Sequence, residues 1–213
     1  MTAQTLAPPT RHPRLRVADS AGYVLTGFPI AVAGFVLLLT GVSVGLGTLP
    51  IVVGVGVLTL TLGVAHGFAG LERARLDGLY GRRLPRPAYR PTRPGPIGAT
   101  LSAGADPRRW LDLAHGLIAF PVAVTTFAVV VSWFAAAAGG LGYVLWEWAL
   151  PRDEPDNQTL AELIGLGSGR PADILLITGL GALAAVTLPF VVRGCAAVQA
   201  GLARSLLIGY PRR

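Results

Sequence analysis

The side chains that could do chemistry are few and widely spaced along this chain. The sequence has no lysine and a single cysteine, Cys195. Without lysine, the chain can form neither a Walker-type phosphate loop nor a Schiff base with a carbonyl substrate. Paired-cysteine metal sites and a His-Glu-x-x-His helix are also absent from the sequence. We therefore predict a protein that is not an enzyme and has no cofactor.

Two of the three histidines deserve comparison. His66 and His115 lie near the ends of two apolar segments, at comparable depth, so a metal or haem pair is geometrically conceivable. No further ligands accompany them. We favour the alternative, interfacial histidines that bond to backbone or water, and predict no metal site.

The largest polar feature outside the apolar segments is the stretch YVLWEWALPRDEPDNQTLAELIGLGSGRPAD, residues 143–173. Tryptophans at a membrane boundary are usually belt anchors. A second hypothesis is that aromatic and charged residues here form the mouth of a ligand site for a cationic or amphipathic molecule. The residues of this hypothetical site are Trp146, Glu147, Trp148, Arg152, Asp153 and Glu154.

The elements that position these residues are membrane spans. The chain is 52% hydrophobic and 14% charged, and residues 20–71 contain no Asp, Glu, Lys or Arg. A helix of that length is more than twice as long as the ~30 Å hydrocarbon core, so this run must fold back into two spans. We predict an all-α protein with four spans, near 23–44, 50–70, 112–138 and 174–192, the last continuing beyond Arg193.

Arginine distribution predicts the orientation of these spans. Sixteen of the eighteen arginines lie in the N-terminal tail, in segment 71–110 or near the C-terminus, and only Arg152 and Arg170 lie between the last two spans. The positive-inside rule then places both termini in the cytoplasm of a multi-pass cell-membrane protein. The first span lacks a small-residue cleavage site and is too long for a signal peptide, so we interpret it as an uncleaved anchor.

A repeated phrase links the first and third spans. FPIAVAGF at 28–35 returns ninety-two positions later as FPVAVTTF at 120–127. Because both spans are predicted to begin in the cytoplasm, we expect two tandem helical hairpins in the same orientation. Pro29 and Pro121 are interpreted as compensated kinks or, alternatively, as functional hinges. GVSVG at 41–45 and GVAHG at 63–67 are predicted close-packing sites.

The remaining segments divide the chain. We expect a disordered basic tail (1–22), a first hairpin with its exit helix (23–81), an irregular Pro- and Arg-rich linker (82–110) and a second hairpin (111–210) with an outer loop (147–173). Arg73, Arg82 and Arg83 are expected to reach phosphates of anionic inner-leaflet lipid. Arg193 either extends to the interface or pairs inside the bundle with a signalling role. No folded nucleic-acid reader is recognised.

Several spaced motifs together resemble a known family. They are YVLTGFP (23–29), LERARLDGLYGRRLP (71–85), DPRRWLDLAHGLIAFPVAVTTF (106–127) and GYVLWEWALP (142–151). The chain resembles the sensor-domain family of actinobacterial membrane proteins, which often stands N-terminal to two-component histidine kinase modules. The resemblance implies a membrane input domain and carries over no catalytic residues. The kinase segments do not follow SLLIGYPRR, so either the member stands alone or its kinase part is missing.

From these observations we expect a non-catalytic sensor that passes an envelope or membrane stimulus to a cytoplasmic histidine kinase or partner. A homodimer is compatible with this function. The alternative is a small transporter or permease subunit. Transporters usually place ionisable groups near mid-membrane, and spans one to three have none at their centres. That difference favours the sensor.

Overall fold

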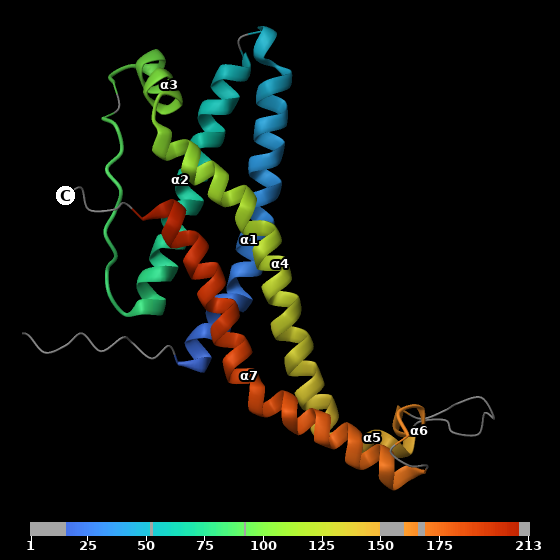
Figure 1. The fold of residues 1–213 in the computed structure, drawn as a ribbon. Helices are drawn as coiled ribbons and strands as arrows, with labels where there is room; N and C mark the ends of the chain where they lie inside the picture. The colour runs from blue at the N-terminus through green and yellow to red at the C-terminus, as the bar shows by residue number, and fades with distance from the viewer. Residues whose placement is uncertain (1–15, 52, 92, 150–159, 166–168, 209–213) are drawn as a thin grey trace, which may run out of the picture.

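The computed structural model describes residues 16–51, 53–91, 93–149, 160–165 and 169–208. Four long helices form its framework (Figure 1): α1 (Val17–Gly47), α2 (Val53–Tyr80), α4 (Pro107–Leu141) and α7 (Arg170–Leu207). The short helices are η1 (Leu49–Ile51), α3 (Pro96–Gly104), α5 (Tyr143–Trp146), η2 (Glu147–Ala149) and α6 (Leu160–Leu163). Over the described ranges there is no strand, in agreement with the predicted all-α class.

Each long helix is long and apolar enough to cross a membrane. The shortest, α2, has 28 residues, which corresponds to about 42 Å at 1.5 Å per residue. Large apolar side chains cover the outside of the bundle; Leu60, Leu175 and Phe190 are 73%, 76% and 70% exposed. A soluble protein would rarely display so much apolar surface, whereas lipid favours it. The four predicted spans are confirmed as candidate membrane-spanning helices.

The helices extend beyond the predicted spans. α1 already begins at Val17, inside the tail predicted at 1–22, whose residues 1–15 lie outside the described ones. α4 continues through Gly139 and Gly140, beyond the third span predicted at 112–138. α7 starts at Arg170, within the predicted outer loop. Hydropathy identifies only the segment of a helix that can lie in lipid. The helix can extend beyond that segment, because its backbone hydrogen bonds form within the helix in lipid and in water alike.

Small residues bring neighbouring helices close together. At Gly41 of α1, an added Cβ would lie 2.3 Å from Oγ1 of Thr61 on α2. On α4 and α7, a Cβ at Gly140 would lie 2.5 Å from the Cα of Gly181. GVSVG is thus a close-packing site as predicted. GVAHG is not, because a Cβ at Gly63 or Gly67 would meet nothing within 4 Å.

GVSVG also has the Gly-x-Ser-x-Gly spacing of a nucleophile elbow. Such an elbow requires a sharp turn between a strand and a helix. Ser43 instead lies inside the continuous helix α1, where its side chain is exposed. The segment therefore serves helix packing and lacks the geometry of that nucleophile.

α1 and α4 cross with opposite chain directions. Phe28 stacks on Phe127 and Phe35 stacks on Phe120, each pair with ring centroids 4.3 Å apart. The connection between α1 and α2 lies at the top of Figure 1 and α5 and α6 at its lower right, so the two helix pairs point away from each other. The expectation that the two repeated spans run in the same direction is wrong for this packing. A sequence repeat shows that two segments are similar, but it does not determine how they are oriented relative to each other.

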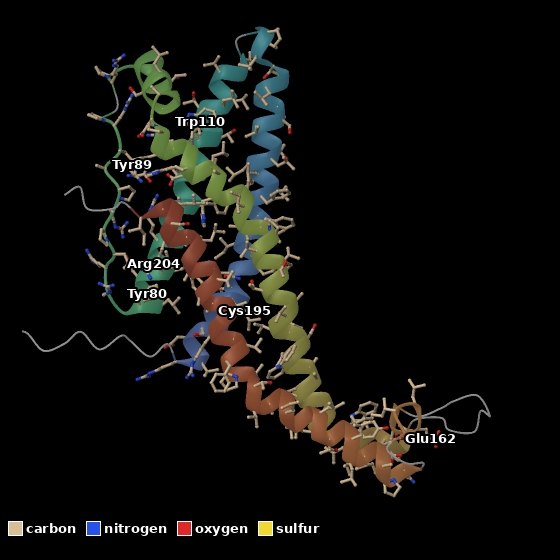
Figure 2. The ribbon with its side chains drawn as sticks, in the orientation of Figure 1. Tyr80, Tyr89, Trp110, Glu162, Cys195 and Arg204 are labelled. Carbon is tan, nitrogen blue, oxygen red and sulfur yellow. The ribbon has the colours of Figure 1, made fainter. Side chains whose placement is uncertain are left out.

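The other ends of these helices gather together. The start of α1, the end of α2 and the end of α7 share one apolar cluster, in which Tyr23, Val24, Leu76 and Leu207 are buried. Figure 2 shows Tyr80 at the end of α2 below Arg204 of α7, whose guanidinium lies 5.5 Å from the Tyr80 ring centroid. The ends of α2 and α7 are therefore in direct contact.

The linker departs from its predicted irregular course. Its residues 83–91 and 93 have no regular structure, but α3 forms a helix from Pro96 to Gly104 that the sequence analysis missed. The linker is fixed to the bundle, since Leu84 N donates to Oδ1 of Asp77 (2.8 Å) and Arg90 N donates to Oδ2 of Asp106 (3.0 Å). Asp106 also caps α4 by accepting from Arg108 N at 3.0 Å.

Candidate functional site

A cavity of about 50 Å³ lies where the four long helices cross. By the same measure a water molecule needs roughly 10–15 Å³, so the cavity has room for a few waters or one small molecule. Apolar residues such as Ile30, Phe68, Val122 and Leu202 form most of its wall. Its polar lining residues are Glu72, Arg75, Asp112, His115 and Gln199.

One side of the cavity is an ionic cluster of α1 and α2. Glu72 accepts a short hydrogen bond from Tyr23 OH and another from Arg75 Nη1. Arg75 also donates through Nη2 to the backbone oxygen of Tyr23, and its guanidinium lies 4.5 Å from the Tyr23 ring centroid. The cluster joins the start of α1 to the end of α2. Its one negative and one positive charge compensate each other.

A second ionic cluster, the Arg73 cluster, joins α2, α4 and the linker. Arg73 Nη2 donates to Oδ1 of Asp112 at 2.6 Å, and the two side chains are only 7% and 2% exposed. His66 Nδ1 lies 3.1 Å from Oδ2 of Asp112, which also accepts from Tyr89 OH at 2.8 Å. Arg73 Nε donates to the backbone oxygen of Leu207 at 3.1 Å. This cluster therefore ties the end of α7 to α2 and α4.

The linker residue of this cluster is Tyr89, which Figure 2 shows beside the upper part of the bundle. Burial, followed by its hydrogen bond to Asp112, raises the pKa of the Tyr89 phenol above its ordinary value of 10.0. The phenol is consequently neutral at physiological pH and remains a donor to Asp112. The sequence analysis assigned no role to Tyr89.

The opposite side of the cavity is neutral and incompletely bonded. Gln199 of α7 donates through Nε2 to Oγ1 of Thr126 on α4 at 2.5 Å. His115 of α4 is 6% exposed, and its buried Nδ1 has no hydrogen-bond partner. A buried polar atom without a partner costs roughly 1–3 kcal/mol. His115 is thus the unsatisfied group of the cavity.

The cavity lies across the approximate two-fold relation between the repeats. Gly27, Ile30 and Ala31 of α1 line it together with their counterparts ninety-two positions later, Ala119, Val122 and Ala123 of α4. The apolar lining is therefore similar on both sides. The polar lining is different: Glu72 and Arg75 lie on one pair of helices, whereas His115 and Gln199 lie on the other.

His66 and His115 do not form a paired metal site in this arrangement. His66 bonds to Asp112, and His115 lines the cavity. Within the part of the chain that the structure describes, no three His, Cys, Asp or Glu side chains gather as a metal would require. Free Cys195 is partly buried on α7.

The predicted outer site has a different geometry from the one expected. Glu147 is 3% exposed and accepts from Arg170 Nε at 2.7 and 2.9 Å, so its carboxylate is engaged in an ion pair. Trp146 and Trp148 are 45% and 74% exposed. Arg152, Asp153 and Glu154 lie outside the described residues.

The other predicted residues lie along the helices. Pro29 and Pro121 are inside α1 and α4, next to the stacked phenylalanines, and α7 contains a third internal proline, Pro189. Arg193 is exposed on α7. Arg82 and Arg83 are exposed as expected, but Arg73 is buried and does not face lipid.

Sequence reasoning missed most of the cavity residues because they lie at the ends of predicted spans, among arginines. Glu72 and Asp112 carried a usable signal. An acidic residue at the edge of an apolar span needs a partner, and arginines are close in sequence. Which arginine pairs with which acid depends on helix packing, and the sequence does not determine it.

Four long apolar helices around a largely apolar cavity indicate a helical, multi-pass membrane protein. A family model described as "Putative sensor" matches residues 23–207, which include α2, α4, α7 and most of α1. The chain belongs to this sensor family. No curated protein and no solved structure matches it.

Proposed function

We propose that this protein is a signal-input module of the cell membrane and that occupancy of the central cavity changes the angle between its two helix pairs. The observation that carries the proposal is the position of the cavity, which all four long helices line. An occupant would contact both pairs at once. It would therefore favour one crossing geometry over others, which is the requirement for a ligand-driven shift.

The route of output leads through α7. Its last residue, Leu207, accepts a hydrogen bond from Arg73, and Arg73 pairs with Asp112 near the cavity. A change at the crossing would thus reach the end of α7. The arginine distribution alone would place both termini in the cytoplasm, which requires α1 and α4 to cross the membrane in the same direction. Because they run in opposite directions here, we propose no orientation and infer only that a histidine kinase module or a separate partner receives the change at the end of α7.

We propose two further partners. The exposed arginines of the linker, including Arg82 and Arg83, would contact anionic inner-leaflet lipid at about 1 kcal/mol each. A homodimer would suit output through histidine kinases, which work in pairs. We propose no nucleic-acid partner.

The test is a fusion of residues 1–213 to a kinase reporter, assayed under membrane stress and with added membrane-soluble compounds. We expect output to change under at least one condition. Constant output under all of them, together with substrate uptake into proteoliposomes, would instead support the transporter alternative.

The proline hypothesis can be tested in the same reporter. If Pro29 and Pro121 allow the crossing angle to change, Pro29→Ala combined with Pro121→Ala should reduce the response while the protein remains folded. Pro189→Ala on α7 is the matched control for helix straightening away from the stacked phenylalanines. An unchanged response in the double variant would assign both prolines to packing alone.

A further inference from the structure

The charges around the cavity cancel in pairs. Glu72 is paired with Arg75, and Asp112 is paired with Arg73. Adding a further ion to a compensated, largely apolar environment would leave that ion without a counter-charge, which is costly away from water. The chemistry of the lining therefore selects against an ionic occupant.

On the neutral side of the cavity, one buried nitrogen atom lacks a hydrogen-bond partner. This atom is Nδ1 of His115, a residue that lines the cavity and is only 6% exposed. Nδ1 of a neutral imidazole donates or accepts according to the tautomer, so an occupant whose hydroxyl or amide reaches this atom can satisfy it. The amide of Gln199 lines the same cavity and offers a second polar contact.

The size of the cavity limits the rest of the occupant. About 50 Å³ corresponds to roughly three to five waters, or to a short chain of similar volume. Ile30, Val122 and Leu202 provide apolar contacts for such a chain. From charge, hydrogen bonding and size together, we propose that the cavity binds a small uncharged amphiphile, such as a short alcohol, with its polar group on His115. This inference rests on the proposed function, because it names the chemical class of the stimulus.

Direct labelling tests the site without relying on signalling. The full chain in detergent or liposomes is irradiated with a short alcohol that carries a diazirine, and the labelled peptides are identified by mass spectrometry. We expect label on α1 near Ala31 and on α4 near Ala123. An excess of 1-butanol should remove it, whereas butyrate and butylammonium should not. Equal competition by the ions would overturn the proposal.

Two variants of α1 provide a matched comparison. Ala31 lines the cavity, whereas Ala33 is exposed on the same helix. We expect Ala31→Leu to reduce labelling about tenfold by filling the space, and Ala33→Leu to change it less than twofold. Equal labelling of the two variants would show that the label is not in the cavity.

The polar contact is tested at His115. His115→Leu should weaken competition by butanol about tenfold, the loss of one hydrogen bond, and His115→Asn should restore part of it. Circular dichroism checks that both variants are folded. Unchanged competition in both would exclude His115 as the contact.

Labelling and signalling separate the two proposals. Specific labelling without any change in kinase output would retain the site and contradict the sensor function. Kinase output that responds to a stimulus, in a protein whose cavity takes no label, would retain the sensor function and contradict the site.

Discussion

At the scale of single residues, the Arg73 cluster makes the largest set of contacts between different elements of the fold. It brings together side chains from α2, α4 and the linker and a backbone oxygen of α7. The central pair, Arg73 with Asp112, is buried, so each charge is compensated by the other and not by water. In an exposed ion pair, water compensates each charge separately.

Removing one partner of the buried pair should therefore destabilise the protein strongly. We expect Asp112→Ala to lower the free energy of unfolding by about 3–5 kcal/mol, because Arg73 is left buried without a counter-charge. The double variant Arg73→Met with Asp112→Leu should cost less than the sum of its single changes. Denaturant unfolding in detergent micelles measures all of them.

The control is the exposed pair of Arg86 with Asp77, where the Arg86 side chain is 61% exposed. Arg86→Ala should cost less than about 1 kcal/mol. A similar loss for Asp112→Ala and Arg86→Ala would mean that burial does not govern the strength of the Arg73–Asp112 interaction.

Tyr89 provides a prediction for pH. Its pKa is raised on folding, so the folded state holds the phenolic proton more tightly than the unfolded state does. The corresponding stability is complete below the ordinary pKa of 10.0 and decreases as pH rises above it. Phenolate absorbance followed during a pH titration should therefore include a component that ionises late. That component should lose the contribution of one tyrosine in Tyr89→Phe, and an unchanged component would contradict the prediction.

At the scale of elements, small residues set how closely the helices pack. Gly140 and Gly181 allow the backbones of α4 and α7 to come into contact. A side chain added at Gly140 would collide with backbone atoms of α7. A flexible neighbour could move aside, but a helix backbone cannot do so without separating the two helices.

Gly140→Val should thus destabilise the α4–α7 contact by about 1–3 kcal/mol. Gly139→Val is a nearly ideal control, because a Cβ at Gly139 meets nothing within 4 Å and the helix propensity change is the same. Thermal unfolding followed by circular dichroism compares the two. If Gly139→Val were as harmful as Gly140→Val, helix propensity rather than packing would explain both.

At the scale of the whole molecule, the two helix pairs are related by an approximate two-fold axis instead of a simple translation. The stacked phenylalanines are the evidence. Phe28, the first residue of one repeat, stacks on Phe127, the last residue of the other, and Phe35 stacks on Phe120 in the same way. Aromatic stacking of this kind adds roughly 0.5–1.5 kcal/mol per pair beyond the area it buries.

Cysteine cross-linking can distinguish the two arrangements. With Cys195→Ala as background, cysteines at 28 and 127, or at 35 and 120, should be joined by a short bifunctional thiol reagent. Cysteines at 28 and 120, or at 35 and 127, should not, because those pairs lie at opposite ends of the contact. Preferential joining of the second set would restore the parallel arrangement that the sequence alone suggested.

Part of the candidate site was accessible from sequence and part was not. His115 attracted attention as a titratable residue near a span end, and the repeat pointed to the helices that line the cavity. Arg73 was misplaced toward lipid, because an arginine after an apolar span has the same local pattern whether it faces lipid or an acid. Residues such as Tyr89 were overlooked because an irregular linker carries no periodicity that predicts contact.

By itself, the sequence determined that the protein is helical, has four apolar spans, contains a repeated phrase and carries its arginines unevenly. These properties follow from local composition, since lipid demands long apolar helices wherever the chain enters it. Only the tertiary structure decided that α1 and α4 cross in opposite directions, that Arg73 meets Asp112, and that His115 borders a cavity. Those outcomes depend on which helix faces fit together, a property of side-chain shape across distant segments that no local pattern records.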